Sequence, residues 1–259
     1  MGKQTLTIKD VAEACGVSIA TVSRVLNDNY YVTPDIKNRV LDTVNRMGYI
    51  PNSAARGLKL NTSGIIGYIT SDISNGYHIM IAKAVEDMIR PANYNLVVCS
   101  TGNNAEAERQ YLKLLVGKNV DALVLNTCGE NDKFILKLNQ TLPMVLVNRR
   151  LNTPGFHGDF ADCNNVLGMY LLTRELIDHG HRRIYLIEGP ERLSNTAERL
   201  EGFSKAMEEI GMTEINSYPY RYHGDYSLES GIDAIRKLAS FSEPPTAILA
   251  TNNTMTIGA

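Results

Sequence analysis

The sequence has only four cysteines among its 259 residues, and they lie far apart along the chain. None belongs to a CxxC pair or to a cysteine–histidine cluster, which excludes the usual spacing of disulfide frameworks and zinc sites. We expect Cys15, Cys99, Cys128 and Cys163 to be small buried hydrophobic residues, and we expect neither a metal nor another cofactor.

Long apolar runs and enzyme motifs are also missing. No stretch approaches the roughly 18 apolar residues of a membrane-spanning helix, and the polar N-terminus lacks the pattern of a secretory signal. We therefore expect a cytoplasmic protein with no membrane partner. The motifs GxSxG, GxxxxGK[ST] and HExxH, and a GxGxxG after a strand, are absent, so we expect no enzyme and assign no catalytic residue.

His179 and His181 flank Gly180 and could suggest a metal site. They follow an apolar helical pattern, however, and glycine with basic neighbours is typical of a helix C-terminus, where glycine adopts the left-handed conformation. The prediction is therefore a helix end and no metal ligand.

Charge is unevenly distributed, although the net charge is only −2. Residues 1–60 carry eight Lys and Arg against five Asp and Glu, so the remainder of the chain is acidic. A basic module joined to an acidic body is typical of a phosphate-binding domain attached to a domain that does not bind nucleic acid. A chance fluctuation would give a similar excess, so charge alone does not decide.

Residues 1–50 have the pattern of three helices. Thr7 caps the first and Gly16 ends it, Ser18 caps the second, and Pro34 lies in the first turn of the third, which ends at Gly48. Two short helices joined by a turn that contains glycine predict a helix-turn-helix, whose second helix enters the DNA major groove.

The second helix has one apolar stripe and one face suited to reading DNA. Arg24 can make a bidentate pair with guanine, and Ile19 and Ala20 can contact thymine methyl groups. A generic small helical bundle with a polar surface would show the same periodicity, so that alternative stays open. The side chains that can bond phosphates are Thr7, Ser18, Thr21, Ser23 and Asn27.

From residue 64 onward, short apolar runs alternate with amphipathic segments, which predicts parallel sheets covered by helices on both faces. Residues 51–62 separate the two patterns and are the predicted linker. The predicted strands are 64–70, 96–100, 122–126, 144–148, 183–188 and 246–250. The predicted helices are 76–90, 105–116, 131–139, 164–179, 195–210 and 227–240.

The runs 7–18 (TIKDVAEACGVS) and 21–27 (TVSRVLN), with Arg39-Val40 and Gly48-Tyr49, closely resemble the head of the lac repressor (LacI/GalR) family. The resemblance continues in later motifs such as 180–184 (GHRRI) and 188–190 (EGP). It implies an all-α helix-turn-helix head followed by an α/β sensor domain of the periplasmic binding protein type. Such a sensor has two Rossmann-like lobes with a ligand cleft between them.

The resemblance also implies the domain boundaries: a DNA-binding domain in residues 1–50, a hinge helix in 51–62 and an effector-binding sensor in 63–259. Leu58 matches a hinge leucine that wedges into the DNA minor groove, with Arg56 and Lys59 beside it for phosphates. Gly57 replaces a usual serine or alanine. Because glycine costs about 1 kcal/mol in a helix interior, this hinge is expected to order less readily.

Six polar side chains match ligand contacts of the family, and a role in capping helices or bonding loops is the alternative for each. Asn148 and Asn253 depart from the family pattern, in which aspartate is common at both positions. Leu193 stands where purine-responsive members carry arginine, so a sugar is the expected effector. The six predicted effector-binding residues are Asn75, Tyr77, Asn148, Arg149, Arg199 and Asn252.

The expected function is that of a sequence-specific DNA-binding transcriptional regulator, a repressor, which binds double-stranded operator DNA as a homodimer and is controlled by a small-molecule effector. The alternative is a solute-binding module with no DNA role, which would have no use for residues 1–60. The sequence also ends within an expected helix, and family members continue beyond that point. We therefore expect a C-terminally truncated member whose second lobe is incomplete.

Overall fold

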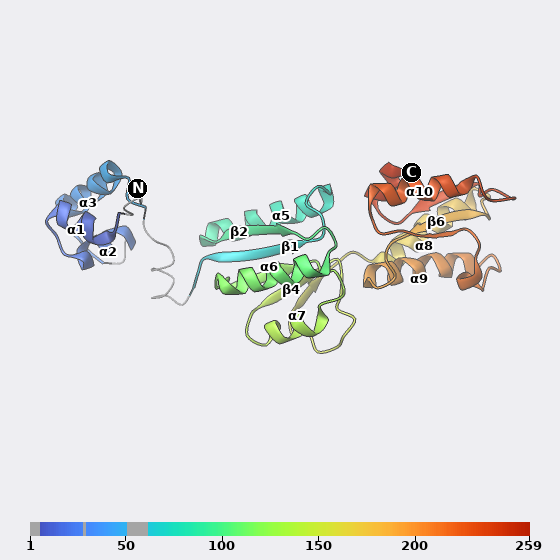
Figure 1. Cartoon of the computed structure of the whole chain (residues 1–259), viewed down its shortest axis with the longest axis horizontal. Helices are drawn as coiled ribbons and strands as arrows, with labels where there is room; N and C mark the ends of the chain where they lie inside the picture. Colours follow the sequence, from blue (N-terminus) through green and yellow to red (C-terminus); the bar gives the residue numbers. More distant parts are fainter. Residues whose placement is uncertain (1–5, 28–29, 51–61) are drawn as a thin grey trace. The chain divides into compact units, whose positions relative to one another are not determined.

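The computed structural model describes residues 6–27, 30–50 and 62–259. The chain divides into two compact units, Met1–Ser63 and Gly64–Ala259, and Figure 1 shows the helices and strands of each. The predicted hinge contacts Arg56, Leu58 and Lys59 lie outside the described residues.

The described part of the first unit contains three helices, α1 (Ile8–Cys15), α2 (Ile19–Asn27) and α3 (Pro34–Met47). Helix α1 ends where Gly16 adopts a left-handed conformation with a φ angle of 65°, which glycine reaches without the steric cost of a Cβ atom. Val11, Val22 and Val40, one from each helix, are completely buried against one another. The three predicted helices are therefore confirmed.

The second unit begins with a lobe built on a five-stranded parallel sheet in the order β2-β1-β3-β4-β5. Its strands are β1 (Ile65–Thr70), β2 (Asn95–Ser100), β3 (Ala122–Leu125), β4 (Met144–Val147) and β5 (Asp159–Ala161). Its helices are α5 (Gly76–Ile89), α6 (Ala105–Gly117) and α7 (Asp132–Asn139).

The two faces of this sheet have separate cores. Leu112 and Leu115 of α6 and Ile135 of α7 pack on one face. On the other face, α5 packs against Tyr68, which is completely buried. Helices on both faces cover the inner strands β1, β3 and β4, which is why the sequences of these strands are almost uniformly apolar.

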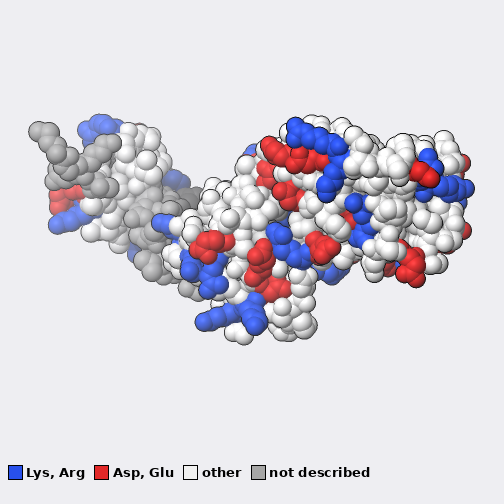
Figure 2. Space-filling model, turned by 45° about the vertical axis from the view of Figure 1, so that its right-hand side comes forward, with Lys and Arg blue, Asp and Glu red and all other residues white. Residues whose placement is uncertain are grey.

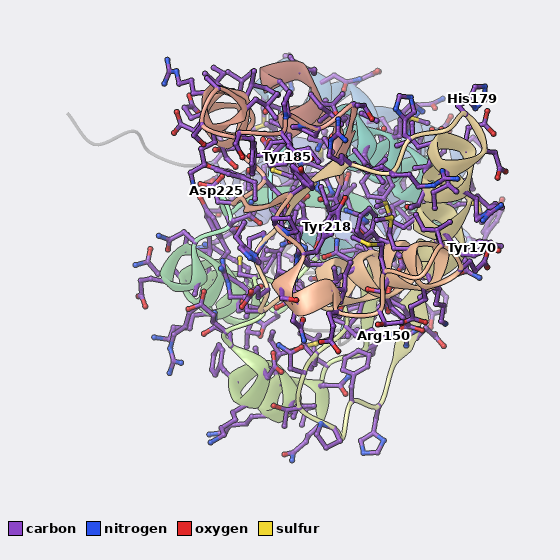
Figure 3. All side chains as sticks on the ribbon, turned by 90° about the vertical axis from the view of Figure 1, so that its right-hand side faces the viewer. Arg150, Tyr170, His179, Tyr185, Tyr218 and Asp225 are labelled. Atoms are coloured by element: carbon purple, nitrogen blue, oxygen red, sulfur yellow. The ribbon has the colours of Figure 1, made fainter. Side chains whose placement is uncertain are left out.

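The second lobe has a three-stranded parallel sheet in the order β7-β6-β8. Its strands are β6 (Ile184–Glu188), β7 (Arg221–His223) and β8 (Ala247–Ala250), and its helices are α8 (Asn165–Asp178), α9 (Ser194–Glu208), α10 (Leu228–Leu238) and α11 (Asn253–Gly258). Met169 of α8 and Phe203 of α9 share one core cluster, and Ala234 of α10 and Met255 of α11 share another with Tyr185. Figure 3 shows Tyr185 and Tyr218 inside this lobe, with Tyr170 and His179 at its periphery along α8.

All six predicted strands and all six predicted helices of the second unit are present, with ends that agree within two residues. Strands β5 and β7 were not predicted. Each has three residues, lies at the edge of its sheet and is partly exposed, so neither carries the apolar run that marks a buried strand.

Two smaller predictions had different outcomes. Gly180 has a φ angle of 91°, and its N–H donates to the Ile177 carbonyl, which confirms the predicted helix end between the two histidines. Cys163 is exposed, so the prediction that all four cysteines are buried was wrong for this one. It follows β5 in the connection to α8, where the chain leaves one sheet for the other and no core covers it.

Within residues 6–27, 30–50 and 62–259, no helix is long and apolar enough to cross a membrane. The same residues contain no group of three or more His, Cys, Asp or Glu arranged to hold a metal ion.

Candidate functional site

Helix α2 has the two faces that the sequence predicts. Val22 and Val25 are buried, whereas Ile19, Ala20 and Arg24 are exposed. The Arg24 guanidinium lies 5.4 Å from the centre of the Tyr30 ring, a cation–π contact that holds the side chain at the surface. The exposed face therefore presents one fork of hydrogen-bond donors beside two apolar side chains.

The polar residues around this face already bond within the head. The hydroxyls of Ser18 and Thr21 are 2.9 Å apart, and Asn27 donates through Nδ2 to the Ser23 carbonyl at 2.7 Å. Thr7 donates from its backbone nitrogen and its hydroxyl to Asp10, which lowers the pKa of that carboxyl. These five residues therefore cap the helices and stabilise them through local hydrogen bonds.

A cavity of about 310 Å³ lies in the second unit, at the carboxyl ends of strands from both sheets. This is where open α/β sheets generally bind ligands. The structure places all six predicted effector-binding residues along its walls: Asn75, Tyr77, Asn148, Arg149, Arg199 and Asn252.

Asn75 and Asn252 also cap helices, as the alternative interpretation of these residues expects. Asn75 accepts from the N–H of Tyr77 at the start of α5, and Asn252 accepts from the N–H of Met255 in α11. In addition, Asn75 and Asn253 exchange two amide hydrogen bonds, of 2.9 and 3.0 Å, from opposite lobes. This pair joins the two lobes at the edge of the cavity.

The turn after β4 places Asn148 and Arg149 inside the cavity wall. Asn148 has a φ angle of 62°, a left-handed conformation that asparagine tolerates better than most residues. Its Oδ1 accepts a 3.4 Å hydrogen bond from Asn195 of the other lobe. Arg149 is only 3% exposed, and its Nη1 donates to Asn103 Oδ1 at 2.9 Å and to the Thr127 carbonyl at 3.0 Å.

Arg199 projects from α9 on the other side of the cavity. Its Nε donates to Asn165 Oδ1 at 3.0 Å, and its Nη1 donates to the Thr251 carbonyl at 2.8 Å and to the Tyr226 hydroxyl at 3.4 Å. The Tyr226 ring also lies 5.7 Å from the Arg149 guanidinium carbon, so one aromatic side chain lies close to both arginines.

His78, which the sequence did not identify as a site residue, forms part of the cavity wall and is 5% exposed. Its Nε2 lies 3.0 Å from the Ser71 hydroxyl, and Nδ1 lies 3.4 Å from the Tyr68 hydroxyl. Burial, together with the positive charge of Arg149, lowers the pKa of His78 to about 4, so the ring is neutral at physiological pH.

The structure also adds lining residues that the sequence analysis missed. Several of them directly follow a predicted strand or open a predicted helix, and this position alone could have identified them. Tyr226 could not be found this way, because it follows the unpredicted strand β7. The missed residues include Ser71, Asn103, Asn165, Asn195, Tyr226 and Thr251.

Comparison with known proteins covers both units. Residues 7–52 match the bacterial regulatory proteins of the lacI family, and residues 63–259 match the periplasmic binding proteins and sugar binding domain of the LacI family. The HTH-type transcriptional repressor PurR of Photobacterium profundum is 35% identical over 252 residues, which cover 96% of this chain and 74% of that protein.

Solved structures agree with the predicted fold class. The lac repressor dimer bound to operator and the anti-inducer ONPF matches with a TM-score of 0.79 and 24% identity, over 98% of this chain and 76% of that chain. A complex of the transcriptional regulator CelR with cellobiose matches with a TM-score of 0.67 and 25% identity, over the same shares of the two chains. The chain therefore belongs to the LacI family of bacterial regulatory proteins, with a helix-turn-helix head and an α/β sensor.

Proposed function

We propose that this chain is a sequence-specific DNA-binding transcriptional repressor controlled by a small molecule in the cavity of its second unit. The observation that carries the proposal is the combination, in one chain, of an exposed Arg24 face on α2 and a polar cavity at the carboxyl ends of two sheets. A solute-binding module with no DNA role would account for the cavity and leave the head without a use.

The head would bind double-stranded operator DNA through α2. Arg24 would donate two hydrogen bonds to guanine, which discriminates a base pair by about 1–3 kcal/mol, and Ile19 and Ala20 would contact thymine methyl groups. Phosphate contacts from the polar residues around α2 would fix the register without selecting the sequence.

Residues 1–50 would form this reader, 51–62 a hinge and 63–259 the sensor, in a homodimer that acts in the cytoplasm. Leu58 would enter the minor groove between Arg56 and Lys59, which contact phosphates. A closed helix-turn-helix dimer reads two half-sites, so the operator would be close to palindromic.

A sugar is the effector class that the cavity suits best. The cavity volume of about 310 Å³ is at the lower end for small-molecule sites. The cavity walls are rich in asparagine amides, each of which can bond two adjacent hydroxyls. Tyr77 and Tyr226 supply aromatic surface for the sugar ring. The CelR relative, solved with cellobiose, binds a ligand of this class.

Selection of binding sites from random duplexes, followed by gel-shift titration, tests the proposal. We expect one enriched, nearly palindromic sequence bound about 10³-fold or more tightly than unrelated DNA at the same salt concentration. Addition of a sugar that the protein binds should change its affinity for this DNA. Binding indifferent to sequence would contradict the proposed DNA reader, and no DNA binding alongside tight sugar binding would support the solute-binding alternative instead.

A further inference from the structure

The buried guanidinium of Arg149 lacks a charged partner. Its two hydrogen bonds, both from Nη1, go to the neutral oxygens of Asn103 and Thr127. Its Nε is fully buried and has no hydrogen-bond partner within the described residues. A buried charge is normally compensated by an opposite charge, because neutral dipoles replace its lost hydration only in part.

Nearby carboxylates are engaged elsewhere. Asp72 lines the cavity, but its Oδ1 accepts from the backbone and hydroxyl of Ser74. The buried Glu108 accepts from the Cys128 N–H and from Asn131. In the part of the chain that the structure describes, no carboxylate forms an ion pair with Arg149.

Arg199, on the opposite wall, is half-buried, and the carboxylate of Asp162 lies close enough to interact with its charge. The described hydrogen-bond partners of Arg199 are an amide, a hydroxyl and a backbone carbonyl, and none of them carries a charge. His78 is neutral and adds no further charge to the cavity. The cavity is therefore lined by two guanidinium groups and a single carboxylate.

This excess is local to the cavity. Figure 2 shows basic and acidic side chains interspersed over the visible surface of the second unit, and the chain beyond residue 60 has more acids than bases. A preference for anions would therefore come from Arg149, and not from the general field of the unit.

The remaining unpartnered atoms suit hydroxyl groups. Asn195 Oδ1 and Thr251 Oγ1 are buried in cavity-lining residues and have no hydrogen-bond partner among the described residues. Asn195 Oδ1 can accept a hydrogen bond from a ligand hydroxyl, whereas the N–H at Arg149 Nε needs an acceptor.

We propose that the effector is an anionic sugar derivative, whose carboxylate or phosphate group binds Arg149 and whose hydroxyls bond the asparagine amides. This rests on the proposed function and narrows its ligand class. The guanidinium, which lines the cavity, would meet the anionic oxygens in the forked geometry that suits either group.

Isothermal titration of the 259-residue protein with matched probes tests this inference. Glucose, glucose 6-phosphate and glucuronate, with the corresponding galactose and fructose compounds, compare a neutral sugar with its phosphorylated and oxidised forms. We expect at least one anionic form to bind about tenfold or more tightly than its neutral parent. Comparison of the phosphorylated with the oxidised sugars identifies which anionic group is recognised. Inorganic phosphate alone should bind weakly.

Arg149→Gln should abolish this preference and bring the ratio of the two affinities close to one, whereas Arg149→Lys should keep part of it. Arg90→Gln, which removes the same charge from an exposed ion pair with Glu86, is the control and should leave the ratio unchanged. Circular dichroism verifies that each variant is folded.

Tight binding of a neutral sugar with no gain from the anionic form would overturn the inference and leave the proposed sensor intact. So would an anion preference that survives in folded Arg149→Gln. If no sugar of either kind binds, the sugar-sensor proposal itself fails.

Discussion

Glu188 is 1% exposed, and Arg221 makes two hydrogen bonds to its carboxylate, from Nε at 2.7 Å and from Nη2 at 2.8 Å. The pair joins β6 to the edge strand β7. Removing one member of a buried ion pair leaves an uncompensated charge, which typically costs about 3–5 kcal/mol.

Arg221→Met should therefore destabilise the second unit by several kcal/mol, while the double variant Glu188→Gln/Arg221→Met should recover much of the loss. Urea denaturation of the wild-type protein and of both variants at one fixed pH measures these differences. A loss below about 1 kcal/mol in the single variant would show that the pair contributes no more than a surface salt bridge.

His78 provides a prediction for pH dependence. Burial, and to a smaller extent the charge of Arg149, lowers the pKa of His78 to about 4. Between pH 6.5 and pH 4 this histidine is therefore protonated in the unfolded chain and neutral in the folded protein. Stability should therefore fall as the pH decreases from 6.5 to 4 and level off below, with a loss of about 2–3 kcal/mol between pH 7 and pH 4.5 from this group.

Urea denaturation of the wild-type protein and of His78→Gln across this range isolates the effect. The glutamine variant should lack this part of the pH dependence, so the difference between the two stabilities should shrink as the pH falls. If the stability of the two proteins depends on pH in the same way, His78 is not the source of the pH dependence.

For single residues, the six predicted effector-binding residues came from a family resemblance, and all six line the cavity. Periodicity alone could not have found them, because loop residues have no repeating pattern. His78 was missed for a different reason. It lies in the first turn of helix α5, between Tyr77 and Ile79, where a histidine has the same helical spacing as a core residue.

At the scale of elements, helices α8 and α9 pack closely at Gly202. A Cβ atom at this position would lie 2.2 Å from the Val166 carbonyl oxygen and 2.9 Å from the Tyr170 nitrogen, both backbone atoms that cannot rotate away. Gly202→Ala should separate the helices and cost about 1–3 kcal/mol, despite the better helix propensity of alanine.

Gly168 in α8 is the matched control, because no atom lies within 4 Å of a Cβ built there. Gly168→Ala should stabilise the protein by up to about 1 kcal/mol. Thermal unfolding of both variants measures the contrast, and equal shifts in Tm would contradict the close packing of α8 and α9.

Element boundaries were well predicted where local chemistry sets them. Thr7 and Gly16 bound α1 through hydrogen bonds and a left-handed turn that the sequence specifies directly. The edge strands β5 and β7 form because a neighbouring strand offers free backbone groups, and this information lies in the tertiary structure and not in their three-residue sequences.

For the whole molecule, the division into two units predicts that a cavity ligand stabilises one of them selectively. At a ligand concentration 100 times the Kd, the second unit should gain about 2.7 kcal/mol, because the ligand binds only its folded form. Hydrogen exchange with and without ligand reports both units in one experiment. In the absence of DNA, protection from exchange should increase in residues 64–259 and stay unchanged in α1 to α3. An equal gain of protection in both units would contradict selective stabilisation of the second unit.

The two-part organisation was predictable because the hydrophobic pattern changes from helices alone to alternating strands and helices near residue 64. The direct contact of the lobes through Asn75 and Asn253 was not, because these residues are 178 positions apart and nothing local pairs them. The predicted C-terminal truncation and incomplete second lobe stay predictions.

The most direct test of the proposed function is the ratio of specific to non-specific DNA affinity for Arg24→Ala, measured at fixed salt on the selected operator. Arg24 is exposed on α2, so alanine should leave the fold intact and lower the ratio about 5- to 150-fold, with the loss concentrated at one guanine position. Arg46→Ala, an exposed arginine on α3, should change the ratio little. An unchanged ratio and unchanged base preference in folded Arg24→Ala would contradict the assignment of α2 as the DNA-reading helix.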